Sequence, residues 1–280
     1  MKIGITAATG QLGQLVVKKL KEKNASVQIV ALVRSPEKAA SLGVEAREFD
    51  YNKPEQLVAA LGDIDKLLLI SGNEIGQRLA QHTNVIHAAK KAGVKLVAYT
   101  SLLRADTTSL SLGPEHLGTE DLLKSSGIPW VILRHGWYTE NYTMSLPSIL
   151  EHGVLAGSSG EGRISSATRA DFAEADVAAL LADGQEGKTY ELAGDETYTM
   201  TELAAEISKQ SGKNIPYVNM PVPDYASLLV QAGLPEGIAQ FFAGTHVATE
   251  KGDLFDDGHQ LSKLIGRKTT SLSDAVAQAL

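Results

Sequence analysis

The sequence predicts an α/β protein: a Rossmann-type, doubly wound parallel sheet with a smaller, mostly helical C-terminal module. Short apolar, β-branched runs alternate with amphipathic helical segments through the first half of the 280 residues, which is typical of a parallel sheet covered on both faces. A turn with two glycines, residues 6–13, joins the first apolar run to the first helical segment. After residue 146 the chain is richer in Gly, Ser and Ala, and strand-like runs become isolated.

The elements follow from the spacing of apolar residues and from helix caps. Gly93 is suited to end a helix. The candidate N-caps are Thr199 for one later helix, and either Ser271 or Ser273 for the last. Strands are expected at 2–6, 28–33, 45–49, 66–70, 96–100, 130–133 and 189–192. Helices are expected at 11–23, from Pro36, and at 76–92, 116–124, 200–210, 222–244 with a break at 233–235, and 271–280.

Composition excludes several classes of protein. A hydrophobic fraction of 43% without a run of about 18 apolar residues indicates a globular protein and no membrane span,. The N-terminus lacks the apolar region of a signal peptide. With no cysteine, disulfides and thiolate chemistry are excluded, and a reducing, cytoplasmic location is expected,. A net charge of -7 argues against nucleic acid as a partner, and the dispersed histidines predict no metal site,.

The turn at residues 6–13 predicts a dinucleotide site. Gly10 would let backbone N–H groups approach a pyrophosphate at a helix N-terminus, and Gly13 would let the helix pack closely on the strand. Ala7 replaces the usual first glycine, so a residue that disfavours positive φ must make the turn. The alternative is a plain strand-to-helix turn. The residues expected to contact the cofactor here are Thr6, Thr9, Gly10, Gln11 and Leu12.

Arg34 ends the second strand, about 20 residues beyond the last glycine of the turn. An arginine at this place suits the 2′-phosphate of NADP(H), although a surface arginine is the other interpretation. Asp50 follows the third strand and could accept a hydrogen bond from the adenine amine, or cap the helix near Pro54. Ser71 and Gly72 end the fourth strand, where the crevice of an open sheet binds its ligand.

With these residues placed, the chain resembles the atypical short-chain dehydrogenase/reductases over its whole length. Within them it resembles the type 2 NAD(P)H:quinone oxidoreductases, close to the triphenylmethane reductases and the nitrogen-metabolite-repression regulators. The resemblance implies an NADP-binding domain at 1–135, with further sheet elements from about 160–195, and an interleaved substrate-side module at 136–280. Its motifs are Thr6–Gly13, Asp50-Tyr51, Ile70-Ser71-Gly72, Ala98–Ser101, Leu133–Tyr142, Ser165–Asp171 and Tyr190–Gly194.

The resemblance also assigns roles to residues. It implies that the segment 133–142 covers the nicotinamide, and it implies NADPH-dependent transfer of hydride to a quinone or another planar acceptor. The further cofactor residues that it implies are Thr100, Trp137, Tyr138, Thr139, Glu140, Asn141 and Tyr142.

One departure from conventional short-chain dehydrogenases bears on mechanism. Their Tyr-x-x-x-Lys pair is replaced by a segment running from His116 to Glu120, so Ser101 has lost the partners it would have there. We expect His116 and Glu120 to be dispensable for the chemistry. Tyr138 and Ser101 are the candidate catalytic residues, and His135 is open between a polar role and a structural one.

Several alternatives stay open. An NADP-sensing regulator without turnover, or a reductase of azo or triphenylmethane dyes, would share these motifs; an aromatic lid favours a substrate cleft over a sensor. The helix expected at 76–92 could pack against a second copy of the chain or simply cover the sheet. Arg169 and Asp171 are interpreted as an ion pair rather than a site, and His82, His87 and His116 as helix-surface residues. The lid residues are Trp137, Tyr138, Tyr142, Phe241 and Phe242.

Overall fold

The computed structural model describes all 280 residues, and the chain forms two compact units. The chain passes between the units several times, so each unit is assembled from segments distant in sequence. No helix in either unit combines the length and apolar character needed to cross a membrane. Unit 1 comprises Met1–Asp106, Pro114–His135 and Arg169–Leu192, and unit 2 comprises Thr107–Gly113, Gly136–Thr168 and Ala193–Leu280.

Unit 1 contains a seven-stranded parallel sheet of order β3-β2-β1-β4-β5-β6-β8. The Rossmann-type architecture expected from the sequence is therefore confirmed. Strand order reverses between β1 and β4, which opens a crevice at the carboxyl ends of the strands. The strands are β1 (Lys2–Thr6), β2 (Gln28–Val33), β3 (Glu45–Glu48), β4 (Lys66–Leu69), β5 (Leu96–Leu102), β6 (Trp130–His135) and β8 (Lys188–Leu192).

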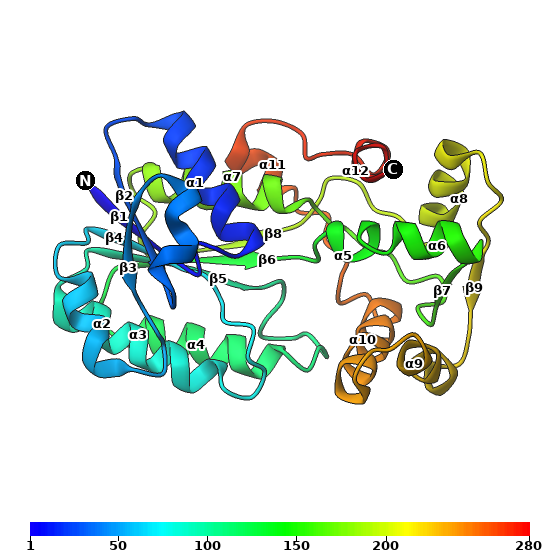
Figure 1. Ribbon diagram of the computed structural model, residues 1–280, viewed down its shortest axis with the longest axis horizontal. Coiled ribbons are helices and arrows are strands. Elements are labelled where there is room, and N and C mark those ends of the chain that lie inside the picture. The colour runs from blue at the N-terminus through cyan, green and yellow to red at the C-terminus, as the bar shows by residue number, and fades with distance from the viewer. The chain divides into compact units, whose positions relative to one another are not determined.

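Helices cover both faces of this sheet (Figure 1). On one face α1 (Gln11–Lys23) packs beside α7 (Arg169–Leu181). On the other, apolar side chains of the sheet and helices form one buried cluster that includes Leu67, Val85 and Tyr99. The helices of this second face are α2 (Pro54–Leu61), α3 (Arg78–Ala92) and α4 (Gly113–Ser125), and a short 3-10 helix, η1 (Pro36–Leu42), follows β2.

Gly13 lies where α1 crosses the end of β1. A Cβ added to this glycine would lie 2.5 Å from the Ala7 carbonyl oxygen and 2.7 Å from Ala8 Cα, closer than packed atoms can approach. The expected close packing of helix on strand at Gly13 is confirmed. The helix expected from Gly76 instead begins at Arg78, because Gly76 has a φ of 85° and lies in the preceding turn.

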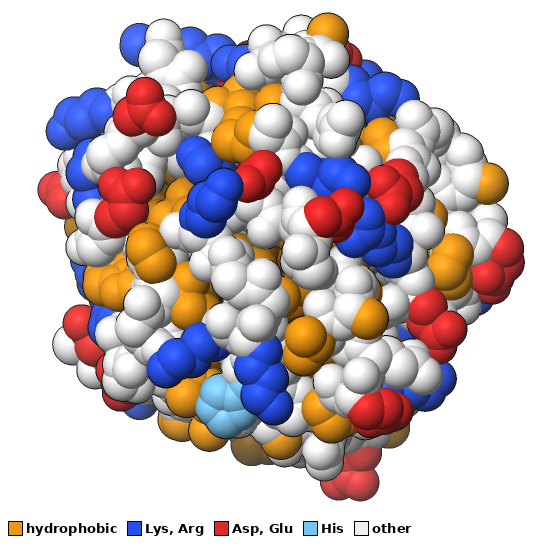
Figure 2. Space-filling model, turned by 90° about the vertical axis from the view of Figure 1, so that its left-hand side faces the viewer, with side chains coloured by type: hydrophobic (Ala, Val, Ile, Leu, Met, Phe, Trp, Pro, Cys, Tyr) orange, Lys and Arg blue, Asp and Glu red, His pale blue; other side chains and the backbone are white.

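The amino ends of the strands carry paired charges. Lys2 and Arg47 both contact Asp63, at 2.6 and 2.7 Å, and Lys95 contacts Asp65 at 2.7 Å. Figure 2 shows acidic and basic side chains interspersed on the face it draws, rather than gathered by sign. Charges at this end neutralise one another, whereas the carboxyl ends carry the candidate site.

Unit 2 is mostly helical, with one short parallel pair, β7 and β9. Helix α8 begins with a capping box: the Thr199 side chain accepts from Glu202 N–H, and the Glu202 side chain accepts from Thr199 N–H. The break expected near residue 233 separates α9 from α10. The elements are α5 (Glu140–Thr143), α6 (Leu146–His152), β7 (Leu155–Gly157), α8 (Met200–Ser211), β9 (Tyr217–Asn219), α9 (Val222–Gln231), α10 (Glu236–Glu250), α11 (Gln260–Ile265) and α12 (Leu272–Ala279).

Candidate functional site

An open cavity of about 620 Å³ lies at the carboxyl ends of β1 to β4, where strand order reverses. We call it the carboxyl-end cavity, and all of its lining belongs to unit 1. Among the residues expected at the cofactor, the lining includes Thr9, Gly10, Gln11, Leu12, Arg34, Asp50, Ser71 and Gly72. Lining residues that sequence reasoning did not place here include Ser35, Lys38, Asn52, Asn73, Glu74, Gln81 and Arg169.

The turn after β1 is built around Ala7 and Gly10. Ala7 itself adopts a φ of 48°, a left-handed conformation that costs an L-residue roughly 1–2 kcal/mol,. The Gly10 N–H donates to the Ala7 carbonyl at 2.9 Å and closes the turn. Strain of this kind, held by the surrounding structure, is found mainly at ligand sites.

Gly10 is needed for space rather than for backbone conformation. Its φ of -74° is open to any residue, and the nearest atom to an added Cβ would be the Ala7 oxygen at 3.1 Å. Gly10 is the N-cap of α1, no side chain caps this end, and the first turn holds no acidic residue. The first N–H groups of the helix therefore face the cavity without a side-chain acceptor, as an anion site requires.

Cationic side chains gather where β2 ends. Arg34 contacts Glu74, with Nη1 3.3 Å from Oε1, and the Arg34 side chain is 69% exposed. An ion pair this exposed contributes little, so Arg34 remains available to a phosphate. Ser35 and Lys38 line the cavity beside it. Ser35 directly follows Arg34 as the N-cap of η1, and Lys38 lies in its first turn. Their closeness in sequence to Arg34 is the signal that could have revealed them.

Asp50 shapes the loop after β3. Its Oδ1 accepts the Asn52 N–H at 3.0 Å, whereas the N-cap of α2 is Lys53. The helix-capping alternative for Asp50 is therefore wrong; the side chain forms an Asx turn that tightens the loop. The neighbouring Tyr51 hydroxyl donates to the Ile70 carbonyl at 3.1 Å, which ties this loop to the end of β4.

Thr6 and Thr100 lie beneath the cavity rather than in its lining. The Thr6 hydroxyl accepts the Ile70 N–H, and the Thr100 hydroxyl accepts the Ser71 N–H, both at 2.9 Å. These two bonds fix the end of β4 to the neighbouring strands, β1 on one side and β5 on the other. Both threonines thus position the loop after β4, and direct contact with a cofactor stays a prediction for them.

His82 supports the same loop from α3. Its Nε2 accepts the Gly72 N–H at 3.1 Å, and its Nδ1 lies 3.1 Å from the Thr119 hydroxyl. His82 is fully buried, so its expected place on a helix surface is wrong. Burial, and then the charge of Arg78, lower the pKa of His82 to about 3. Arg78 also donates to the Gly72 carbonyl and pairs with Glu115 at 3.0 Å.

Stability should fall in mild acid because His82 stays neutral in the fold. A histidine whose pKa is lowered on folding stabilises fully above about pH 6.5, and that stabilisation is lost as the pH falls toward the lowered value,. From pH 7 to pH 5 the loss from His82 should be about 2 kcal/mol. Urea unfolding of wild type and His82→Gln at both values measures it. The variant should lose less stability than wild type over that interval, and equal losses would contradict this account.

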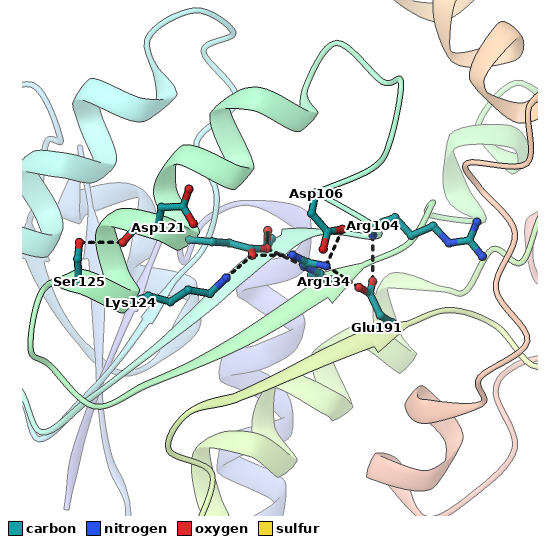
Figure 3. A network of polar contacts seen from close by, with 9 residues as sticks. Arg104, Asp106, Asp121, Lys124, Ser125, Arg134 and Glu191 are labelled. Carbon is teal, nitrogen blue, oxygen red and sulfur yellow. Dashed lines mark hydrogen bonds and ion pairs between the residues drawn. The ribbon is translucent and has the colours of Figure 1, made fainter.

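An ion network centred on the buried pair Arg134 and Glu120 occupies the place of the missing lysine (Figure 3). Arg134 on β6 donates to Glu120 at 2.8 Å from both Nε and Nη2, and to Glu191 at 2.7 Å. The Ser101 hydroxyl donates to Glu120 at 2.7 Å, so a carboxylate is its partner in place of the tyrosine and lysine that the chain lacks. Burial alone would raise the pKa of Glu120, but hydrogen bonds from Arg134 and Ser101 lower it.

The two histidines near this network, His116 and His135, are bonded to other buried side chains. His116 is buried, not on the surface, and its Nδ1 lies 2.8 Å from the Tyr99 hydroxyl; burial lowers its pKa well below the usual value. His135 Nε2 lies 2.8 Å from Asp176 Oδ1, and its ring stacks on Phe172. Neither histidine lines the carboxyl-end cavity.

The segment after β6 belongs to unit 2. Thr139 N–H donates to the Ala167 carbonyl, and Ala167 N–H donates to the Trp137 carbonyl. Trp137, Asn141 and Tyr142 line a second cavity of about 300 Å³, which we call the unit 2 cavity. Tyr138, Thr139 and Glu140 line neither cavity. The cofactor roles of residues 137–142 and the catalytic roles of Tyr138 and Ser101 stay predictions.

A Rossmann-type sheet with an uncapped helix N-terminus and cationic side chains at its carboxyl edge defines a dinucleotide-binding protein,. The profile of the NAD(P)H-binding family matches residues 7–183, and the chain belongs to that family.

Close relatives share the whole fold. Quinone oxidoreductase 2 of Escherichia coli is 52% identical over 98% of this chain and 97% of its own. The structure of the E. coli NADPH-dependent quinone oxidoreductase complexed with NADPH aligns with a TM-score of 0.96, covering 99% of both chains. Triphenylmethane reductase of Citrobacter sp., complexed with NADP(H), is 39% identical with a TM-score of 0.96, covering 99% of this chain and 100% of its own. The resemblance stated from the sequence is confirmed.

Proposed function

We propose that the protein is an NADPH-dependent reductase that transfers hydride to a quinone-like planar acceptor. The observation that carries the proposal is the fit of the carboxyl-end cavity to NADP(H). Gly10 is the N-cap of a helix end that no side chain caps, and Arg34 and Lys38 line the same cavity as cations for a 2′-phosphate,. The NADPH complex of the 52% identical relative supports the same cofactor, and the name of that relative, a quinone oxidoreductase, supports the acceptor.

Each part of the cavity has a role in this proposal. The N–H groups at Gln11 and Leu12 would bind the pyrophosphate beside Gly10, whose own N–H closes the turn to Ala7, and the loop Asp50–Asn52 would hold the adenine end. The loop held by Thr6, Thr100 and His82 would border the cofactor at Ser71 and Gly72. NADPH, when bound, supplies the hydride, and with one proton a quinone becomes a hydroquinone.

The chain offers no strong proton donor at the position used by conventional dehydrogenases. The Ser101 hydroxyl is already donated to Glu120, and His116 is neutral and bonded to Tyr99. Acceptors whose reduction needs a positioned acid, such as simple ketones, are therefore disfavoured. A quinone suits this site, because its reduced oxyanion can take a proton from water. Tyr138 remains our candidate for any side-chain contribution.

An acceptor panel tests the function. Purified protein without added flavin should oxidise NADPH rapidly with menadione, and slowly without an acceptor. An azo dye and a triphenylmethane dye, in parallel assays, test the alternative acceptors. NADPH binding with no turnover of any of the three would favour the regulatory alternative and contradict our proposal.

A cytoplasmic location is part of the proposal.

Arg34→Ala should weaken NADPH binding about tenfold while leaving NADH binding unchanged, because one charge-assisted hydrogen bond to the 2′-phosphate is lost. Glu74→Gln is the matched control: it frees Arg34 from its exposed ion pair and removes a negative charge, so NADPH should bind more tightly. Nucleotide titration calorimetry measures both. If Arg34→Ala bound NADPH with the wild-type affinity, Arg34 would not be the residue that binds the 2′-phosphate.

A further inference from the structure

The unit 2 cavity has the size and surface of a small-molecule site. Its volume of about 300 Å³ is at the lower end of the range for ligand pockets,. The whole lining belongs to unit 2, so the cavity shares no lining residue with the carboxyl-end cavity. Its apolar lining includes Trp137, Ile149, Leu155, Met200, Leu229 and Phe242.

A neutral histidine presents one donor to this apolar surface. His246 is 8% exposed, and its Nδ1 accepts the Ser158 N–H at 3.1 Å. Burial lowers the pKa of His246 to about 4, so the ring is uncharged at neutral pH. A neutral imidazole that accepts at Nδ1 carries its proton on Nε2. That N–H has no hydrogen-bond partner within the protein.

The position of this imidazole is fixed on two sides. A Cβ at Gly157 would lie 2.8 Å from His246 Cε1, so only glycine lets the ring sit against β7. The Tyr225 ring packs on the other side, with the two ring centroids 4.6 Å apart. A donor held this rigidly loses little entropy when it binds an acceptor.

Two tyrosine hydroxyls add to the polar part of the lining. Tyr225 is 9% exposed, and neither its hydroxyl nor that of Tyr142 has a hydrogen-bond partner in the protein. Burial raises the pKa of Tyr225 to about 12 and holds that of Tyr142 well above its usual value, so both remain protonated. His246, Tyr225 and Tyr142 thus bring three donors without protein acceptors to the lining of one largely apolar cavity, and a ligand that supplies an acceptor would complement them,.

We propose that the unit 2 cavity binds an apolar ring that bears a carbonyl oxygen, with His246 Nε2–H and the Tyr225 hydroxyl donating to that oxygen. The choice of a quinone as this ligand rests on the proposed function. The binding site itself rests on the lining and its unpartnered donors, so the two can fail separately.

Equilibrium binding without nucleotide tests the site directly. Trp137 lines the cavity, and a Trp130→Phe background makes it the sole tryptophan, so quenching of its fluorescence reports occupancy. The probes are menadione and 2-methylnaphthalene, which has a similar shape and no carbonyl. Because the chain has no cysteine, menadione cannot attach to a thiol.

Tyr225→Phe and His246→Asn should each weaken menadione binding about 3- to 10-fold and leave 2-methylnaphthalene binding unchanged within about twofold. Asparagine can still accept the Ser158 N–H, and the Tyr225 hydroxyl has no partner in the protein to lose, so Tyr225→Phe should keep the wild-type melting temperature. Unchanged menadione binding in folded Tyr225→Phe and His246→Asn, or equal weakening of both probes, would overturn the proposal. Binding that depends on Tyr225, without NADPH turnover, would leave this site standing and refute the proposed function.

Discussion

Gly10→Val should abolish NADPH binding and leave the protein folded. The glycine has an ordinary φ of -74°, and an added Cβ would meet only the Ala7 oxygen at 3.1 Å. The branched side chain would therefore project into the carboxyl-end cavity, where the account places the pyrophosphate. Losing two or more charge-assisted hydrogen bonds implies affinity at least roughly 100-fold weaker. Titration calorimetry for NADPH, with circular dichroism for the fold, measures both effects.

Gly13→Ala is the matched control for that experiment. Its Cβ would lie 2.5 Å from the Ala7 oxygen, so overpacking between helix and strand should cost about 1–3 kcal/mol of stability,. The two glycines of one turn thus predict opposite outcomes: Gly10→Val loses the ligand, and Gly13→Ala loses stability. A folded Gly10→Val protein that binds NADPH normally would mean that residues 6–13 form only a turn.

Glu120→Ala should lower the free energy of unfolding by about 3–5 kcal/mol, because it leaves the Arg134 guanidinium buried without its main partner,. Arg134 would lose two hydrogen bonds of 2.8 Å, and Ser101 its acceptor. Urea unfolding measures the loss. NADPH affinity of the folded fraction should be unchanged, since none of these side chains lines the carboxyl-end cavity.

Replacing Glu120 and Arg134 together by leucine is the control for the buried charge. Removing both partners of a buried pair costs less than removing one, so the double variant should recover part of the lost stability. A Glu120→Ala protein as stable as wild type would contradict the structural role. A folded Glu120→Ala protein that binds NADPH but has lost quinone turnover would show instead that Glu120 takes part in catalysis.

The sequence alone predicted the strands of the sheet and the side of the carboxyl-end cavity formed by the turn around Gly10. Apolar periodicity reports buried strands and helices directly, and the turn around Gly10 has a local signature. Arg169 could not be placed, because it lies far along the chain from Gln81, the nearest of the other lining residues in sequence, and reaches the cavity only through the fold. His82 and Glu120 were hidden for another reason: buried polar residues at helical spacing look like surface residues until their partners are known.

Anaerobic single-turnover measurement with menadione tests the central claim, that NADPH held at the carboxyl-end cavity reduces a quinone without a second cofactor. Absorbance at 340 nm follows NADPH oxidation, and menadiol is quantified in the same samples. We expect one menadiol for each NADPH oxidised by the flavin-free wild-type protein, and no reaction for Gly10→Val. Wild-type protein that needs added flavin, or folded Gly10→Val protein that reacts as fast as wild type, would contradict it.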